Sequence, residues 1–255
     1  IEAFNLAEKY QIPVIVLTDL YLNESYSSLD HPLDFKNIKI DRGLLVKEGE
    51  IKDYKRYMIT ETGVSPRAIP GQEGYMHVAI SDEHDEKGHD ISDVLAGLPF
   101  MLKIRNAIME KRMRKELYIL KEFEKPSLYG ENDADITIVS WGSTRGAVRE
   151  AIEILKNENI KANSLEIKYI HPFQAEEVKN ILSNAKRILL VENNYSAQLG
   201  SLIAQYTGIF IKHKLLRYDG EPITPLQIVN KVKEIIYSEK EKLIVRWKNG
   251  RIKII

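Results

Sequence analysis

Arg67 is the side chain in this sequence whose surroundings most favour chemistry with an anion. Pro66 precedes it, and Pro70 and Gly71 turn the chain just after it. A guanidinium on a backbone held in this way loses little conformational freedom when it pairs with a carboxylate or phosphate. Arg67 is therefore a candidate anion contact. The alternative is an ion pair with one of the many nearby acidic residues, since paired surface arginines are common.

Three histidines lie among acidic residues downstream of Arg67. The histidines are His77, His84 and His89, and the acids between them include Glu83, Asp85 and Glu86. Imidazole and carboxylate groups bind metals, but this spacing matches no familiar zinc or iron pattern, and no H-E-x-x-H is present. Such runs also form hydrogen-bonded loops. We therefore favour a polar loop over a metal site.

The segment that holds these residues, 65–89, is expected to be an ordered loop. It contains two prolines and three glycines, which exclude helix interior and break any long strand. A long loop without regular structure is usually either functional or disordered. Apolar residues such as Tyr75, Met76, Val78 and Ile80 argue against disorder. We predict that the loop presses against another part of the protein.

Overall composition excludes several classes of protein. The 255 residues contain 37 basic and 37 acidic side chains, so charge does not favour a nucleic-acid or membrane partner. No apolar run approaches the ~20 residues that span a bilayer. There is no cysteine, which excludes disulfides and cysteine-ligated zinc or iron–sulfur sites within this chain. The expected compartment is the cytoplasm.

The first half of the chain has irregular spacing of apolar residues between three regular elements. We predict a helix over 2–10, a strand buried on both faces over 13–18, and a helix over 100–123. Short strands are expected at 44–46 and 54–59. The basic run 110–116 in the long helix is interpreted as a solvated face, because acids interleave the bases. The helical start at Ile1 suggests the C-terminal portion of a longer polypeptide.

The second half alternates strands and helices after a linker predicted at 129–135. This alternation favours a parallel sheet with right-handed crossovers. The last helix is expected to begin with Thr224 as its N-cap and Pro225 at its first position. Asn249 and Gly250 predict a terminal hairpin. The predicted strands are 136–141, 162–169, 187–192 and 215–218, and the predicted helices are 145–157, 175–182, 198–207 and 224–237.

Two polar features fall where these strands end. The turn from Gly142 to Gly146 could present backbone N–H groups and a helix dipole to an anion, although a tight turn is the simpler interpretation. Glu192 ends an apolar strand, where a carboxylate can serve a ligand or cap the next helix. The sequence leaves both alternatives open.

Several motifs resemble one enzyme family along nearly the whole chain. VENNYSAQLGSLIA at 191–204, IKYIHPF at 167–173 and RYDGEPITP at 217–225 resemble the C-terminal transketolase-like domain of 2-oxoacid:ferredoxin oxidoreductase α subunits. Residues 3–25 resemble the end of that subunit's pyrimidine-binding thiamine domain, and the SPRAIPG loop resembles its connecting segment. The resemblance implies an α/β fold with domains at 1–30, 31–130 and 131–255, the last a mostly parallel sheet with helices on both faces.

The resemblance also implies a reaction. The family oxidatively decarboxylates 2-oxoacids on thiamine diphosphate, passes electrons through iron–sulfur clusters to ferredoxin, and forms acyl-CoA. Thiamine diphosphate, Mg²⁺ and the cluster are expected mainly on, or shared with, a partner β subunit. The glutamate that activates the cofactor would lie upstream of Ile1, so no catalytic residue is expected in this chain. Its C-terminal domain would serve assembly or shape the approach to the active site.

One departure from the family bears on the substrate. Pyruvate-specific relatives carry Asp-Gly-Phe-Arg where this chain has Asp19-Leu-Tyr-Leu22, so Leu22 replaces the arginine that meets the substrate carboxylate. A buried carboxylate still needs a cationic partner. We predict that Arg67 replaces that arginine, and that the substrate is 2-oxoglutarate or a broad range of 2-oxoacids.

Two alternatives remain at this point. One is a thiamine enzyme without ferredoxin, of the transketolase or 2-oxoacid dehydrogenase β type, against which the SPRAIPG loop argues. The other is a non-catalytic α/β assembly module, against which the truncated α/β unit at the N-terminus argues.

Overall fold

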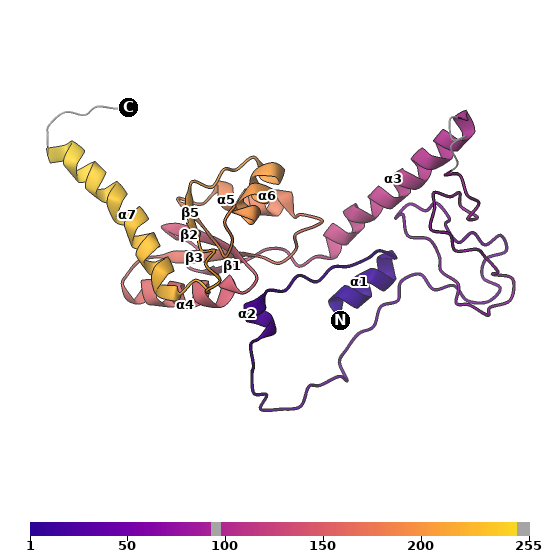
Figure 1. Ribbon diagram of the computed structural model, residues 1–255, viewed down its shortest axis with the longest axis horizontal. Helices are drawn as coiled ribbons and strands as arrows, with labels where there is room; N and C mark the ends of the chain where they lie inside the picture. Colours follow the sequence, from indigo (N-terminus) through magenta and orange to yellow (C-terminus); the bar gives the residue numbers. More distant parts are fainter. Residues whose placement is uncertain (93–97, 249–255) are drawn as a thin grey trace. The chain divides into compact units, whose positions relative to one another are not determined.

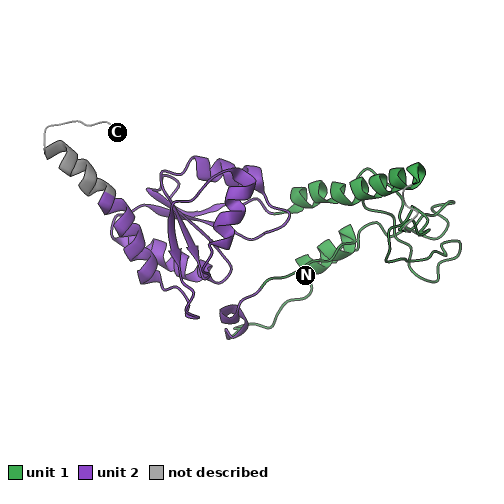
Figure 2. Ribbon diagram, turned by 45° about the horizontal axis from the view of Figure 1, so that its top comes forward, with its two compact units in different colours: residues 1–17, 27–123 green, residues 18–26, 124–255 purple. Residues whose placement is uncertain are grey.

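The chain folds into two units. The computed structural model describes residues 1–92 and 98–248, with side chains up to residue 238. Figure 2 colours the first unit, 1–17 and 27–123, apart from the second, which comprises 18–26 and the chain from 124 onward. The domain limits expected at residues 30 and 130 stay a prediction. Among the described residues, none of the helices combines the length and the apolar composition that a membrane span requires.

The second unit is a five-stranded sheet with the order β1-β3-β2-β4-β5. Its strands are β1 (Leu128–Gly130), β2 (Ile136–Trp141), β3 (Ala162–Ile167), β4 (Ile188–Glu192) and β5 (His213–Leu216). All neighbours pair in parallel except β1, which is antiparallel to β3. The predicted mostly parallel sheet is confirmed. The predicted linker is wrong at 129–130, because these residues belong to the edge strand β1.

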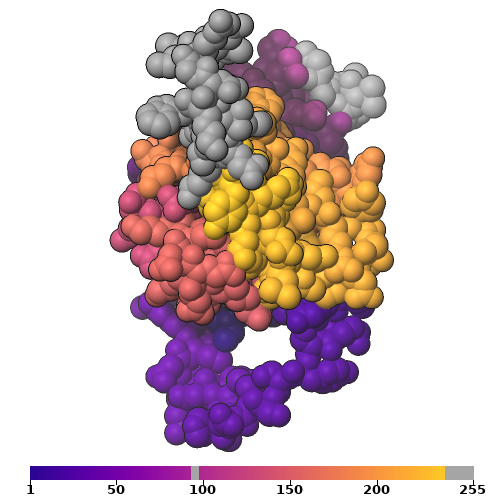
Figure 3. Space-filling view, turned by 90° about the vertical axis from the view of Figure 1, so that its left-hand side faces the viewer, coloured from indigo at the N-terminus to yellow at the C-terminus, as the bar shows by residue number. Residues whose placement is uncertain are grey.

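Helices cover both faces of this sheet (Figure 1). They are α4 (Thr144–Asn157), α5 (Ala175–Ser183), α6 (Gln198–Thr207) and α7 (Pro225–Lys248). Ile138 and Leu189 pack with α4 and α7, whereas Val139 and Leu190 pack with α5 and α6. In Figure 3 the yellow part of α7 lies beside the salmon α4. Successive strand residues enter opposite cores, which explains the continuous apolar runs.

The last helix begins as predicted but ends differently. The Thr224 hydroxyl accepts from the backbone N–H of Gln227, and the Gln227 side chain accepts from the N–H of Thr224. This reciprocal pair is a capping box. The predicted terminal hairpin is wrong over 243–248, since α7 continues to Lys248, and its turn at Asn249 lies outside the described residues. A continuous helix satisfies its own backbone, whereas a hairpin strand needs a partner.

The first unit contains little regular structure. Its helices are α1 (Glu2–Tyr10) and α3 (Pro99–Glu122), with Pro99 in the first turn as predicted. The buried strand expected at 13–18 does not form. Ile15 is 82% exposed, and no described segment pairs with it. A parallel strand needs hydrogen-bonded neighbours, and the described chain supplies none here. Neither of the strands expected at 44–46 and 54–59 forms. The first is reduced to a single bridge between Leu45 and Arg67, and residues 54–59 contain a turn and no strand.

Candidate functional site

Arg67 is held on its backbone as well as through its side chain. Its N–H donates to the Leu44 carbonyl at 2.7 Å, and its own carbonyl accepts from Val46 N at 3.1 Å. The loop beside it rests on a tyrosine. The Tyr54 hydroxyl donates to the Pro66 carbonyl and accepts from the Ala68 N–H. The predicted rigid mounting of Arg67 is therefore present, although hydrogen bonds provide it together with the prolines.

The Arg67 guanidinium forms a bidentate pair with Glu8 of α1. Its Nη2 lies 2.5 Å from Glu8 Oε2, and its Nη1 lies 3.3 Å from Oε1. Arg42 Nε adds a third bond to Oε2 at 3.1 Å. Hydrogen bonds from Arg67, followed by those from Arg42, lower the pKa of Glu8 to about 2. The structure thus shows a carboxylate on Arg67, as the chemistry predicted, but the carboxylate belongs to the chain.

Sequence reasoning missed Glu8 because the pair joins residues 59 positions apart. Position 8 falls within the predicted first helix, but helical periodicity does not identify a distant partner. The structure brings Arg67 and Arg42 together around Glu8. Leu22, the other predicted substrate contact, lies in the second unit.

Tyr75 is one of the residues that anchor the predicted loop 65–89. Tyr75 is buried, and its hydroxyl donates to the Lys47 carbonyl and accepts from Ile51 N. It packs with Val46 and Ala68. Met76 is 98% exposed, so not all apolar residues of this loop press inward as expected. The loop is thus anchored at a few points rather than along its length.

The three histidines have separate partners. His77 Nδ1 lies 2.9 Å from the Tyr75 carbonyl, and His89 Nδ1 lies 2.8 Å from Asp85. His84 is buried and stacks on Tyr57, with ring centroids 3.6 Å apart. Among the described residues, no three His, Cys, Asp or Glu side chains come together as a group that could hold a metal ion. The histidines serve as loop contacts in this structure.

The basic run 110–116 is not a solvated face, which corrects the prediction. Lys111 is only 5% exposed, and its ammonium donates to the Tyr57 carbonyl at 3.1 Å. Arg114 and Lys115 donate to the carbonyls of Thr60 and Gln11. The loops packed on α3 lack ladders of their own, so their carbonyls need donors from side chains. The helix supplies them from its basic side.

Burial changes the acid–base behaviour of two of these lysines. Burial, together with neighbouring positive charges, lowers the pKa of both Lys111 and Lys115 to about 8.

Apolar residues on another side of α3 are exposed, with Met113 56% and Leu117 60% exposed. These two apolar side chains therefore do not pack into a core of the described chain. The loop carbonyls require hydrogen-bond donors, so the loops pack against the basic side of α3.

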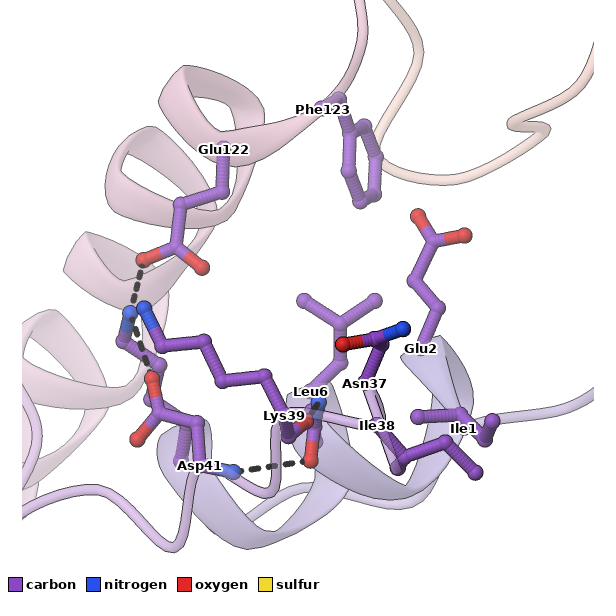
Figure 4. Close-up of a pocket in the computed structure, with 11 residues that line it drawn as sticks. Ile1, Glu2, Leu6, Asn37, Ile38, Lys39, Asp41, Glu122 and Phe123 are labelled. Carbon is purple, nitrogen blue, oxygen red and sulfur yellow. Dashed lines mark hydrogen bonds and ion pairs between the residues drawn. The ribbon is translucent and has the colours of Figure 1, made fainter. Parts of the chain in front are cut away.

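A pocket of about 550 Å³ lies in the first unit, between α1, the segment 37–41 and the end of α3 (Figure 4). Lys9 lines the pocket and forms ion pairs with two other lining residues, with Nζ 2.6 Å from Glu122 and 3.2 Å from Asp41. The Glu122 hydrogen bond raises the pKa of Lys9. Tyr10 donates to the same carboxylate. These bonds join α1 to α3.

At the sheet edge of the second unit, Glu192 is fully buried and caps α6. Its oxygens accept from the N–H groups of Leu199 and Gly200 at 3.0 Å, and from the Asn194 side chain at 2.6 Å. Of the two alternatives left open by the sequence, the structure shows the helix cap. A carboxylate there also complements the positive end of the α6 dipole.

The turn after β2 binds a carboxylate of the chain, mainly through a side-chain hydroxyl. Ser143 Oγ donates to Asp19 Oδ2, and the other Asp19 oxygen accepts from Leu22 N at 2.9 Å. Burial opposes ionisation of Asp19, but the hydrogen bonds from Ser143 and Leu22 outweigh it and lower the pKa. Asp19 is the N-cap of α2 (Leu20–Asn23), which carries Leu22. Sequence reasoning noted both ends of this contact without joining them.

Comparison with known proteins places these features in a family. The family described as pyruvate:ferredoxin oxidoreductase core domain II matches residues 134–241. The chain is 34% identical over 249 residues to 2-oxoacid:ferredoxin oxidoreductase 2, subunit alpha, of Aeropyrum pernix, covering 96% of this chain and 37% of that protein. It is 33% identical to the corresponding α subunit of Saccharolobus solfataricus, covering 95% and 38%. The chain thus spans little more than a third of these relatives.

A solved structure agrees over most of the chain. The 2-oxoglutarate:ferredoxin oxidoreductase of Magnetococcus marinus, with 2-oxoglutarate, coenzyme A and succinyl-CoA bound, matches 90% of this chain and 38% of its own. The TM-score is 0.79 and the sequence identity 33%. Over the part that it spans, this chain belongs to the family of 2-oxoacid:ferredoxin oxidoreductase α subunits.

Proposed function

We propose that this chain is part of the α subunit of an enzyme that oxidatively decarboxylates 2-oxoacids to acyl-CoA and passes the electrons to ferredoxin. The observation that carries the proposal is the match across 90% of the chain, at a TM-score of 0.79, to a 2-oxoglutarate:ferredoxin oxidoreductase. That structure holds 2-oxoglutarate and coenzyme A. The relatives named above are α subunits of 2-oxoacid:ferredoxin oxidoreductases, which supports the same reaction class.

The redox and thiamine chemistry is proposed to reside mainly on a partner β subunit. The sequence has no cysteine, so it does not fit a cysteine-ligated cluster. The described residues also offer no group of three side chains suited to a metal ion. The anion-binding turn at Ser143 already holds Asp19. The residues present therefore do not fit a cysteine-ligated cluster or a metal ion held by the described residues alone, and thiamine diphosphate is proposed to lie mainly on, or be shared with, the β subunit.

Arg67 stays a proposed contact for the 2-oxoacid carboxylate. It already binds a carboxylate through both guanidinium nitrogens, which is the geometry a substrate carboxylate would use. A substrate would have to displace Glu8. If it does, Glu8→Gln should lower the KM for the 2-oxoacid, and Arg67→Ala should raise it, with the KM for CoA unchanged. If Arg67 serves only to fasten α1, neither variant will change either KM.

The test of the reaction uses the intact complex that contains this chain. Reduction of a low-potential dye would be followed with pyruvate, 2-oxobutyrate and 2-oxoglutarate, each with and without CoA. CoA-dependent reduction is the expected result, and the ranking of substrates would define the range that Leu22 permits. No reduction by any oxoacid, in a complex whose visible absorption shows intact iron–sulfur clusters, would overturn the proposal. Absence of cluster absorption, with thiamine present, would favour a transketolase-like enzyme.

A further inference from the structure

The short segment around α2 is fastened to the second unit through one carboxylate. Asp19 accepts from the Ser143 hydroxyl with one oxygen and from Leu22 N with the other. The same residue thus starts α2 and joins it to the turn after β2. Residues 18–26 group with the second unit although residues 1–17 belong to the first.

The Ser143 side chain bonds to Asp19 and does not cap its own helix, α4. It occupies the N-cap position of α4, where a serine side chain ordinarily accepts a bond from the first turn. Here its side chain makes no such cap and donates to Asp19 instead. Gly142, with a φ of 58°, has the left-handed backbone that turns the chain at this point. The Asp19 carboxylate also complements the positive end of the α4 dipole.

This contact lies at the edge of the sheet where ligands of open α/β folds bind. The chain leaves β2 for β3 on one side and returns to β4 on the other, so the order reverses between β2 and β4. Ligands of such sheets bind in the crevice beyond the carboxyl ends of the strands at that reversal. The exposed side chains that α2 brings to this edge are Leu20, Tyr21 and Leu22, which are 74%, 58% and 54% exposed.

We propose that Asp19, held by Ser143, is a positioning residue that sets the place of α2 and with it the substrate-facing position of Leu22. The inference rests on the proposed function, because only that function makes position 22 a substrate contact. Ser143 acts indirectly, by holding Asp19. Neither residue is proposed to take part in the decarboxylation or electron transfer. The bond to Leu22 N is local, whereas Ser143 reaches Asp19 from the turn after β2 through its hydroxyl and its backbone, so these Ser143 bonds join this short helix to the sheet within the described residues.

The kinetic test compares Ser143→Ala, Ser143→Thr and Ser201→Ala in the intact complex. Loss of a charge-assisted hydrogen bond in Ser143→Ala should raise the KM for the 2-oxoacid about 3- to 10-fold and leave the KM for CoA unchanged. Threonine keeps the hydroxyl and should restore the KM. Ser201 is exposed, and its hydroxyl donates to the carbonyl of Ala197, the N-cap of its own helix, so Ser201→Ala should change neither KM.

Hydrogen exchange of the peptide 19–25 separates failure of this inference from failure of the proposed function. Ser143→Ala should speed exchange at the amides of Leu22 and Asn23, which bond to Asp19. Unchanged exchange overturns the anchor whether or not the complex oxidises 2-oxoacids. Faster exchange with an unchanged KM overturns the positioning role. A wild-type complex inactive toward every oxoacid overturns the proposed function and, with it, the role of Leu22, while exchange still tests the anchor.

Discussion

The two units of this chain are stabilised in different ways. The second unit buries two apolar layers against the faces of one sheet, with side chains such as Ile138, Leu189 and Leu190 entirely inaccessible. The first unit uses side-chain hydrogen bonds to backbone carbonyls, from Tyr54, Tyr75, Lys111 and Lys115. A sheet satisfies its own backbone and needs only apolar cover, whereas irregular loops need polar partners throughout. Stability should therefore depend on volume in one unit and on individual polar contacts in the other.

The largest effect is expected from removing volume in the second unit. Leu189→Ala should lower the free energy of unfolding by roughly 2–5 kcal/mol, because Leu189 is fully buried and a cavity would remain. Leu226 is 63% exposed in α7, so Leu226→Ala should change it by less than about 0.5 kcal/mol. Denaturant unfolding followed by circular dichroism measures both. Equal effects at the two positions would contradict a volume-dependent core.

In the first unit the sharpest steric test is at Gly63. A Cβ added there would lie 2.2 Å from the Lys111 carbonyl oxygen, and φ is 80°. Gly63→Ala should therefore cost roughly 2–4 kcal/mol, the sum of overpacking and left-handed strain. Gly49 has a similar φ of 76° with no atom within 4 Å of the added Cβ, so Gly49→Ala should cost only about 1 kcal/mol.

Hydrogen exchange of the peptides around 57–64 would report the Gly63 effect locally. If the two glycine variants behave alike, the close approach of this loop to α3 is wrong.

Lys111 tests whether polar contacts carry the first unit. Burial lowers its pKa to about 8, so between pH 8 and 10.5 the unfolded chain holds a proton that the folded chain has lost. Stability should rise with pH across this window, by roughly 1–3 kcal/mol for Lys111. Lys111→Met should flatten that rise, and Lys115 should maintain part of it, since its pKa is also about 8.

The control for Lys111 is Lys103→Met, at an exposed position of the same helix. Denaturant unfolding at pH 7.5, 9 and 10.5 compares the variants. A pH dependence unaltered in Lys111→Met would mean that its ammonium is not buried in solution.

The smallest effect is expected at the partly buried ion pair of Glu8 with Arg67. Its pKa is lowered to about 2 by Arg67 and Arg42, so the pair stabilises the fold fully above pH 4.5. That contribution is lost as the pH falls from 4.5 through about 2. Glu8→Gln should remove this part of the acid dependence, whereas Glu73→Gln, at an exposed loop position, should leave it in place. The free energy of unfolding would be measured between pH 2 and 5 for the wild type and both variants. If Glu8→Gln shows the same pH dependence as the wild type, the ion pair does not persist in solution.

Prediction from the sequence succeeded for elements whose apolar pattern or capping residues alone fix their structure. The runs at 136–141 and 187–192 became β2 and β4, because residues buried on both faces must be continuously apolar. Thr224 and Pro225 start α7, since capping depends on neighbouring residues alone. The run 13–18 has the same apolar pattern, but it remains exposed because no described strand pairs with it.

The site was predicted only in part, for a related reason. The sequence by itself determined that Arg67 stands between prolines on a constrained loop, that a tight turn follows β2, and that no cysteine is present. Only the tertiary structure decided that Glu8 pairs with Arg67 and that Asp19 binds to Ser143 in the turn. It also decided that the basic side of α3 packs against the loops of the first unit. Local geometry follows from neighbouring residues, whereas a charged group's partner is selected by whichever distant segment the fold brings within hydrogen-bonding distance.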